Sequence, residues 1–116
     1  IKDADKLSVE NISKKIEELA GKARDRKLFE KDLTGATFTV SSLGKIGGIG
    51  FTPIINPPEV GIISISRSRN DVELQNGEVK EKVIIPFGLS YDHRVINGAD
   101  AGRFSLALKE KLESLS

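Results

Sequence analysis

Two segments with helical periodicity, one at each end of the chain, enclose a region rich in β-branched residues, and this arrangement constrains the fold most strongly. Between residues 7 and 26 apolar side chains recur at helical spacing, at Val9, Ile12, Ile16, Leu19, Ala20 and Ala23. Ser8 stands where an N-cap is expected. A second apolar stripe, from about residue 99 to residue 115, consists of Phe104, Ala107, Leu108, Leu112 and Leu115. The sequence therefore predicts a helix at each end.

The polar side of the first helical segment is densely charged, with Lys14, Lys15, Glu17, Glu18, Lys22, Arg24, Asp25 and Arg26. Acidic and basic residues three or four positions apart on a helix can pair with one another. We interpret this run as a solvated helix face with charge pairs. A docking strip for a partner is the alternative.

Between the two helices the residue pattern predicts strands. Residues 36–43 and 60–66 are rich in β-branched and aromatic side chains. Asn76-Gly77 is a strong signal for a hairpin turn, and residues 79–91 supply the returning strand. The predicted order is α-β-β-β-α. We expect residues 1–116 to form one α+β unit, with a mixed or antiparallel sheet flanked by helices.

A glycine-rich loop follows the first predicted strand, with glycines at positions 44, 47, 48 and 50. A phosphate-binding loop would need Ser or Thr after Lys45, where Ile46 stands, and no helical pattern follows the loop. We therefore predict a structural turn rather than a nucleotide site. Residues 51–58 contain three prolines and are expected to be extended and irregular.

Composition removes several classes of function. Eighteen basic residues against 17 acidic ones give a net charge of +1, which gives no reason to expect nucleic acid or an anionic membrane as a partner. The chain has no cysteine, which excludes disulfides, thiolate metal ligands and cysteine nucleophiles, and fits a reducing compartment. No apolar run is long enough for a membrane span. Since the chain has no methionine, even at position 1, we expect it to be a piece of a longer protein.

The segment from residue 89 to residue 104 concentrates the polar groups that could carry chemistry. It contains the single histidine, His93, between a predicted strand and a glycine turn before the last helix. Loops in such positions often present functional groups. Histidine also suits proton transfer near neutral pH, so His93 is either a catalytic base or a structural or surface residue.

Three motifs resolve this choice through a resemblance. They are Asp-His93-Arg-Val-Ile-Asn97-Gly-Ala-Asp, Phe38-Thr-Val-Ser41-Ser-Leu-Gly, and Phe51-Thr-Pro-Ile-Ile-Asn-Pro-Pro-Glu59. Together they resemble the catalytic domain of the dihydrolipoamide acyltransferase (E2) components of the 2-oxo acid dehydrogenase complexes. The residues of these motifs are most similar to those of the pyruvate-type branch of this family. The resemblance implies a chloramphenicol-acetyltransferase-like fold, of which residues 1–116 would be the C-terminal half.

The resemblance also implies an activity, the transfer of an acetyl group between dihydrolipoyl-lysine and coenzyme A. His93 would be the general base that takes the thiol proton, and Ser41 would donate its hydroxyl to the oxyanion. Asn97 occupies the place where this family more often has aspartate, and its amide can still orient its neighbours. The resemblance further implies that acetyl-CoA would be a substrate, that the lipoyl group would belong to a domain outside this chain, and that no metal would be needed.

Assembly is implied as well. In this family the histidine of one chain and the serine of its neighbour meet at the interfaces of a homotrimer, and trimers build a larger core. The E1 and E3 components would bind through parts outside this chain, in a bacterial cytoplasm or, alternatively, a mitochondrial matrix. Two other hypotheses remain, a non-catalytic E2-related scaffold of the same complex and a small ligand-binding domain with a coincidental motif.

Overall fold

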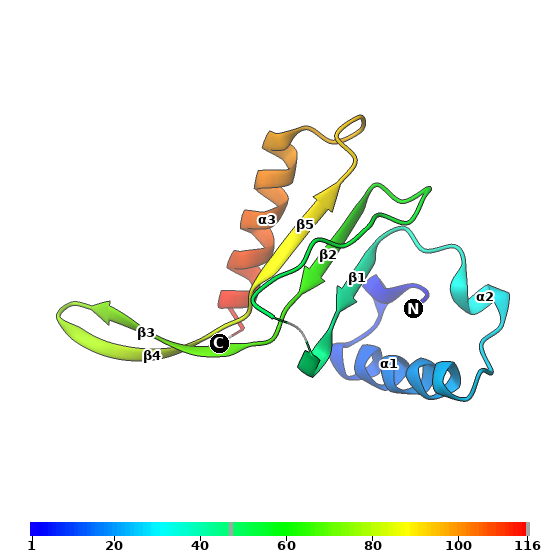
Figure 1. Ribbon diagram of the computed structural model, residues 1–116, viewed down its shortest axis with the longest axis horizontal. Helices are drawn as coiled ribbons and strands as arrows, with labels where there is room; N and C mark the ends of the chain where they lie inside the picture. The colour runs from blue at the N-terminus through cyan, green and yellow to red at the C-terminus, as the bar shows by residue number, and fades with distance from the viewer. Residues whose placement is uncertain (47, 116) are drawn as a thin grey trace. The chain divides into compact units, whose positions relative to one another are not determined.

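The first of two compact units, Ile1–Thr37, is helical. The computed structural model describes residues 1–46 and 48–115 and divides into this unit and a second one, Phe38–Ser116 (Figure 1). The helical unit contains the 3₁₀ turn η1 (Ala4–Lys6), α1 (Val9–Arg24) and the short α2 (Glu30–Leu33). α1 confirms the first predicted helix and its cap, because the Ser8 side chain accepts a hydrogen bond from Asn11 N–H at 3.2 Å.

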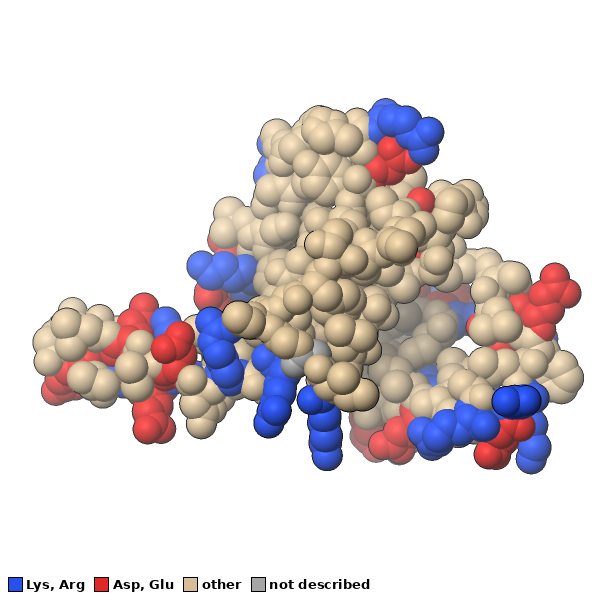
Figure 2. Space-filling model, viewed as in Figure 1, with Lys and Arg blue, Asp and Glu red and all other residues tan. Residues whose placement is uncertain are grey.

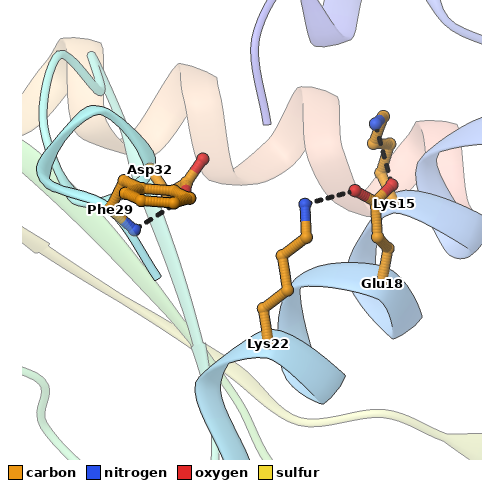
Figure 3. A network of polar contacts seen from close by, with 5 residues as sticks. All are labelled: Lys15, Glu18, Lys22, Phe29 and Asp32. Atoms are coloured by element: carbon orange, nitrogen blue, oxygen red, sulfur yellow. Dashed lines mark hydrogen bonds and ion pairs between the residues drawn. The ribbon is translucent and has the colours of Figure 1, made fainter. Parts of the chain in front are cut away.

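Charge pairs on α1 confirm the interpretation of its polar side as a solvated face. Glu18 accepts hydrogen bonds from Lys15 at 2.9 Å and from Lys22 at 2.7 Å (Figure 3). The bond from Lys15, followed by that from Lys22, lowers the pKa of the Glu18 carboxyl to about 2. Figure 2 shows acidic and basic side chains next to one another along this helix. Exposed pairs of this kind add little stability.

α2 is a helix of four residues that the sequence pattern did not predict, because one turn is too short to show periodicity. Its start is fixed by a reciprocal contact. The Asp32 carboxylate accepts a hydrogen bond from Phe29 N–H at 2.9 Å (Figure 3), and Asp32 N–H donates to the Phe29 carbonyl at 2.9 Å. These bonds satisfy main-chain groups that a helix terminus leaves unpaired.

The second unit is built on a three-stranded sheet with the strand order β1-β2-β5. The strands are β1 (Thr39–Ser42), β2 (Gly61–Ile65) and β5 (Phe87–Tyr91). β1 and β2 are parallel, whereas β2 and β5 are antiparallel, so the predicted mixed sheet is confirmed. β2 lies in the middle, and its first four residues are buried. A central strand with both faces covered carries a continuous apolar run, as Ile62 and Ile63 illustrate.

The last helix, α3 (Gly98–Glu113), packs against β5 and confirms the second predicted helix (Figure 1). Ala101 is its one buried residue, and the Phe104 ring lies 5.8 Å from that of Phe38, measured between centroids. Gly61 leaves room for Phe38, because a Cβ there would stand 2.9 Å from Phe38 Cε2. This cluster attaches the helix to the strands that carry the candidate site.

The β3–β4 hairpin corrects one sequence prediction. The predicted returning strand 79–91 is wrong as a single strand: β4 (Glu78–Ile84) pairs with β3 (Arg69–Gln75), whereas β5 joins the three-stranded sheet. Pro86 separates them because proline has no N–H for a ladder, and its carbonyl instead accepts from Ser66 N–H at 3.0 Å. Among its described residues the unit thus has five strands, not three. The predicted turn is confirmed, with φ of 52° at Asn76 and 82° at Gly77.

The segment between β1 and β2 has no strand among its described residues, as expected for 51–58. After β1 the chain forms a 3₁₀ turn, η2 (Gly44–Ile46), in which Gly44 has a φ of 56°. That conformation favours glycine and fits the predicted structural turn. Gly47 of the glycine loop lies outside the described residues.

Gly88 on β5 offers a test of how tightly this sheet is packed. An added Cβ would stand 2.9 Å from Ser64 Oγ, and Ser64 is only 1% exposed, so it has little room to move. We expect Gly88→Ala to lower the free energy of unfolding by about 1–3 kcal/mol, measured by denaturant titration. Gly102→Ala on α3 is the control, because nothing lies within 4 Å of its added Cβ and alanine favours helix. Equal stability of Gly88→Ala and wild type would contradict the packing described.

Candidate active site

The loop between β5 and α3 carries two of the three predicted site residues, His93 and Asn97. Its start is attached to the sheet, because Asp92 N–H donates to the Val60 carbonyl at 2.9 Å. The Asp92 carbonyl then accepts hydrogen bonds from Val95 N–H at 3.0 Å and Ile96 N–H at 2.9 Å. The histidine therefore stands in a turn with defined main-chain bonds on both sides.

Asp92 and Arg94 flank the histidine and bind each other. Asp92 Oδ1 accepts from Arg94 Nε at 3.0 Å, and Oδ2 accepts from Nη2 at 2.8 Å, which is a bidentate pair. Asp92 Oδ1 also accepts from Arg94 N–H at 3.0 Å. The side-chain bonds from Arg94, then its N–H bond, lower the pKa of the Asp92 carboxyl from 3.8 to about 2. The same contact raises the pKa of Arg94.

This lowered pKa predicts how the loop responds to acid. Because Asp92 has the lower pKa in the folded state, its contacts add stability that is fully present above pH 3.8 and disappears as the pH falls through about 2. We expect the ¹³C signal of its carboxyl carbon to titrate near pH 2 in the folded protein and to move toward 3.8 in Arg94→Ala. A midpoint near 3.8 in the wild type would contradict the bidentate contact.

His93 lies on the surface of the unit, with its ring beside that of Tyr91. The two ring centroids are 5.5 Å apart, and the ring planes are tilted by 39°. Tyr91 is the last residue of β5 and is held in register opposite Gly61. An exposed imidazole is accessible to a substrate from solvent, as a general base must be.

Asn97 is the N-cap of α3 and, among the described residues, forms no hydrogen bond with the histidine side chain. Its Oδ1 accepts from Asp100 N–H at 2.8 Å, and its Nδ2 donates to Asp100 Oδ2 at 2.8 Å. Asp100 Oδ1 in turn pairs with Arg103. Asparagine is among the preferred N-cap residues, so the side chain at this position has a clear local role in starting the helix.

Ser41 lies on a different part of the sheet. It pairs with Ser64 of β2, whereas Tyr91, two residues before His93, pairs with Gly61. The two levels are therefore three residue steps apart along β2, which is roughly 10 Å. Thr39 Oγ1 donates to Glu59 Oε1 at 2.6 Å and attaches β1 to the segment before β2. Within one chain the structure does not bring Ser41 and His93 together.

A cavity of about 300 Å³ opens beside the histidine loop. Its walls come from the residue before β1, the start of β2 with the residue before it, the end of β5, the loop and the first half of α3. They include Phe38, Val60, Tyr91, Ile96 and Phe104. The lining is almost entirely apolar.

Asp92, Arg94 and Tyr91 are parts of this site that could not be predicted from the sequence pattern. The motif around His93 did contain a signal for Asp92 and Arg94, because aspartate readily accepts a hydrogen bond from the N–H two residues later. No pattern of spacing would show that the Arg94 side chain folds back onto the same carboxylate. That contact depends on the conformation of the turn. The start of the turn is fixed by the hydrogen bond from Asp92 N–H to the Val60 carbonyl.

Known proteins resemble this chain in both sequence and fold. All of residues 1–116 match the family described as 2-oxoacid dehydrogenases acyltransferase (catalytic domain). The chain is 44% identical, over 115 residues, to the dihydrolipoyllysine-residue acetyltransferase component of the pyruvate dehydrogenase complex of Pseudomonas aeruginosa, covering 99% of this chain and 21% of that protein. It is 42% identical, over 114 residues, to the dihydrolipoyllysine-residue succinyltransferase component of the 2-oxoglutarate dehydrogenase complex of Rickettsia bellii, covering 98% of this chain and 28% of that protein.

A solved structure of the dihydrolipoamide acetyltransferase of Azotobacter vinelandii is similar with a TM-score of 0.87 and 43% identity. It was solved in work on the role of a serine, a histidine and an asparagine in that enzyme's catalytic mechanism. The match covers 95% of this chain and 45% of that one, so the chain spans less than half of that structure. The match over all 116 residues and the shared α+β fold lead to one conclusion: the chain belongs to the catalytic-domain family of the 2-oxoacid dehydrogenase acyltransferases.

Proposed function

We propose that the protein to which residues 1–116 belong transfers an acetyl group between dihydrolipoyl-lysine and coenzyme A in a pyruvate dehydrogenase-type complex. In this proposal residues 1–116 are the C-terminal part of its catalytic domain. The observation that carries the proposal is the loop at His93. It presents an exposed imidazole from a turn fixed to the sheet, in a chain whose family is that of the acyltransferases.

The assignment of the site residues is supported by their spacing. In the Azotobacter enzyme the serine, the histidine and the asparagine are separated by the same numbers of residues as Ser41, His93 and Asn97. We assign His93 as the general base, Ser41 as the donor to the oxyanion and Asn97 as the residue that starts α3 after the histidine loop. The N-cap bonds of Asn97 support the last of these roles.

The reaction follows from these groups. The His93 imidazole takes the proton from the attacking thiol, and the resulting thiolate forms a bond to the carbonyl carbon of the acetyl thioester. The carbonyl oxygen becomes an oxyanion, which accepts a hydrogen bond from Ser41 Oγ–H. When the intermediate collapses, its bond to the first sulfur breaks, and the departing thiolate recovers the proton from the imidazolium. Acetyl-CoA and the dihydrolipoyl thiol are the two substrates. Because the attacking thiol gives up one proton and the departing thiolate takes one up, no net proton is consumed.

The separation of Ser41 from His93 within one chain supports a site completed by a second chain. We propose a homotrimer in which the histidine of one subunit faces the serine of its neighbour, with trimers assembled into a larger core. The lipoyl group and the sites for the E1 and E3 components belong to regions outside this chain. Among the described residues no helix has the length and apolarity to cross a membrane. We place the protein in a bacterial cytoplasm, without a nucleic-acid or membrane partner.

Acyl specificity provides the test, because the relatives include both an acetyltransferase and a succinyltransferase. The full-length protein is assayed with dihydrolipoamide and either acetyl-CoA or succinyl-CoA. We expect kcat/KM to favour acetyl-CoA by about tenfold or more. A preference for succinyl-CoA would move the protein to the 2-oxoglutarate branch, and no transfer from either donor would contradict the proposed activity.

A further inference from the structure

One residue, Asp92, connects the histidine loop to the rest of the unit. Its N–H donates to the Val60 carbonyl just before β2, and its own carbonyl accepts from the N–H groups of Val95 and Ile96. Those three bonds use only main-chain atoms, so any residue except proline at position 92 could form them. They hold the two ends of the turn, but none of them involves the peptide group between His93 and Arg94.

The Asp92 carboxylate supplies the remaining constraint. It accepts from Arg94 N–H at 3.0 Å, which fixes the peptide group on the far side of the histidine. Arg94 Nε and Nη2 occupy the same carboxylate at 3.0 and 2.8 Å. The Asp92 side chain is only 18% exposed, whereas that of Arg94 is 89% exposed. The aspartate is thus the anchored member of the pair, and the arginine closes over it from solvent.

The His93 side chain has little else to hold it. In the part of the chain that the structure describes, its imidazole forms no hydrogen bond, and its ring contact is with Tyr91. The direction of the ring therefore depends on the main chain of His93 and on the Tyr91 ring. A general base must stay within hydrogen-bonding reach of the proton that it removes, and a misplacement of about 1 Å can cost about 10²-fold in rate.

We propose that Asp92 is a positioning residue for His93, and that its carboxylate holds the histidine turn through Arg94 N–H and the Arg94 side chain. This inference rests on the proposed role of His93 as the general base. Because both carboxylate oxygens are occupied by Arg94, Asp92 acts through the conformation of the turn rather than by binding the imidazole.

The test uses the full-length enzyme and acetyl transfer from acetyl-CoA to dihydrolipoamide. We expect Asp92→Ala to lower kcat by about 10- to 100-fold, with both KM values within about twofold of wild type, because orientation rather than binding is lost. Asp92→Asn keeps an oxygen that can accept from Arg94 N–H, and we expect it to recover most of that loss. Asp32→Ala is the matched control, since it also removes a carboxylate that accepts a main-chain N–H, but in the helical unit. It should keep wild-type kcat.

A double-mutant cycle separates positioning from general loss of structure. If Asp92 acts through His93, Asp92→Ala has no further effect on the residual rate of His93→Ala. The inference is overturned if Asp92→Ala lowers that residual rate as much as it lowers the wild-type rate, or if kcat of Asp92→Ala equals wild type. Should Asp92→Ala fail to fold, the same cycle with Asp92→Leu gives the same two readings, because leucine is similar in size to aspartate and its side chain accepts no hydrogen bond. Wild-type activity in His93→Ala would instead overturn the proposed function itself.

Discussion

Replacing His93 with alanine is expected to lower kcat for acetyl transfer by about 10²–10⁴-fold, the usual contribution of a general base. The attacking thiol is then left mostly protonated at neutral pH, because the imidazole that would take its proton is gone. His93 is exposed and forms no ion pair among the described residues, so its removal does not disturb the sheet or α3. The measurement is steady-state acetyl transfer to dihydrolipoamide over a range of pH.

Two further observations make the loss in His93→Ala interpretable. Its thermal unfolding should match that of wild type, since among the described residues the imidazole has one ring contact, with Tyr91, and forms no hydrogen bond. The loss should also shrink at high pH, where solvent hydroxide and free thiolate replace the missing base. A variant with more than a third of wild-type kcat at neutral pH would contradict the assignment of His93.

Ser41→Ala should lower kcat by about 10²–10³-fold, or about 2.7–4 kcal/mol of transition-state stabilisation, the range found when one oxyanion donor is removed. The KM values should change little, because the hydroxyl binds the oxyanion of the intermediate and not the substrate carbonyl. Ser41 is half-buried on β1 in the register that places it beside Ser64.

The neighbouring serine supplies a matched control for Ser41. Ser42 is exposed, and its Oγ accepts from Gly44 N–H at 3.2 Å. Because successive strand residues face opposite sides, its hydroxyl cannot take the place of that of Ser41. Ser42→Ala should keep kcat within about threefold of wild type. If Ser42→Ala were the more damaging of the two, Ser41 could not be the oxyanion donor.

Local patterns in the sequence were sufficient for the elements whose signals are local. Ser8 and the helical spacing after it identified α1, and Asn76-Gly77 identified the hairpin turn, because caps and tight turns depend on a few adjacent residues. The division of 79–91 into two strands was not predicted. The division depends on strand pairing, because the first part pairs with β3 and the second part pairs with β2. Pro86 can be recognised as the boundary between the two strands only once this pairing is known.

The site shows the same limit. The motif around His93 indicated where a base could stand, and the structure places this histidine on a turn bonded to Val60, the residue before β2. The distance between Ser41 and His93 could not be predicted, because it follows from the register of β1 and β5 on β2, and register is set by long-range pairing. The role of Asp92 was likewise hidden, since its carboxylate contacts need the folded turn.

Complementation between two inactive variants tests the central claim most directly, that His93 and Ser41 serve one site shared by two chains. His93→Ala and Ser41→Ala are co-expressed in equal amounts, so that subunits mix during assembly. Each shared site then has both intact residues in about a quarter of cases, and we predict recovery to about a quarter of wild-type activity. Activity no higher than the average of the two variants expressed alone would contradict a site shared between chains.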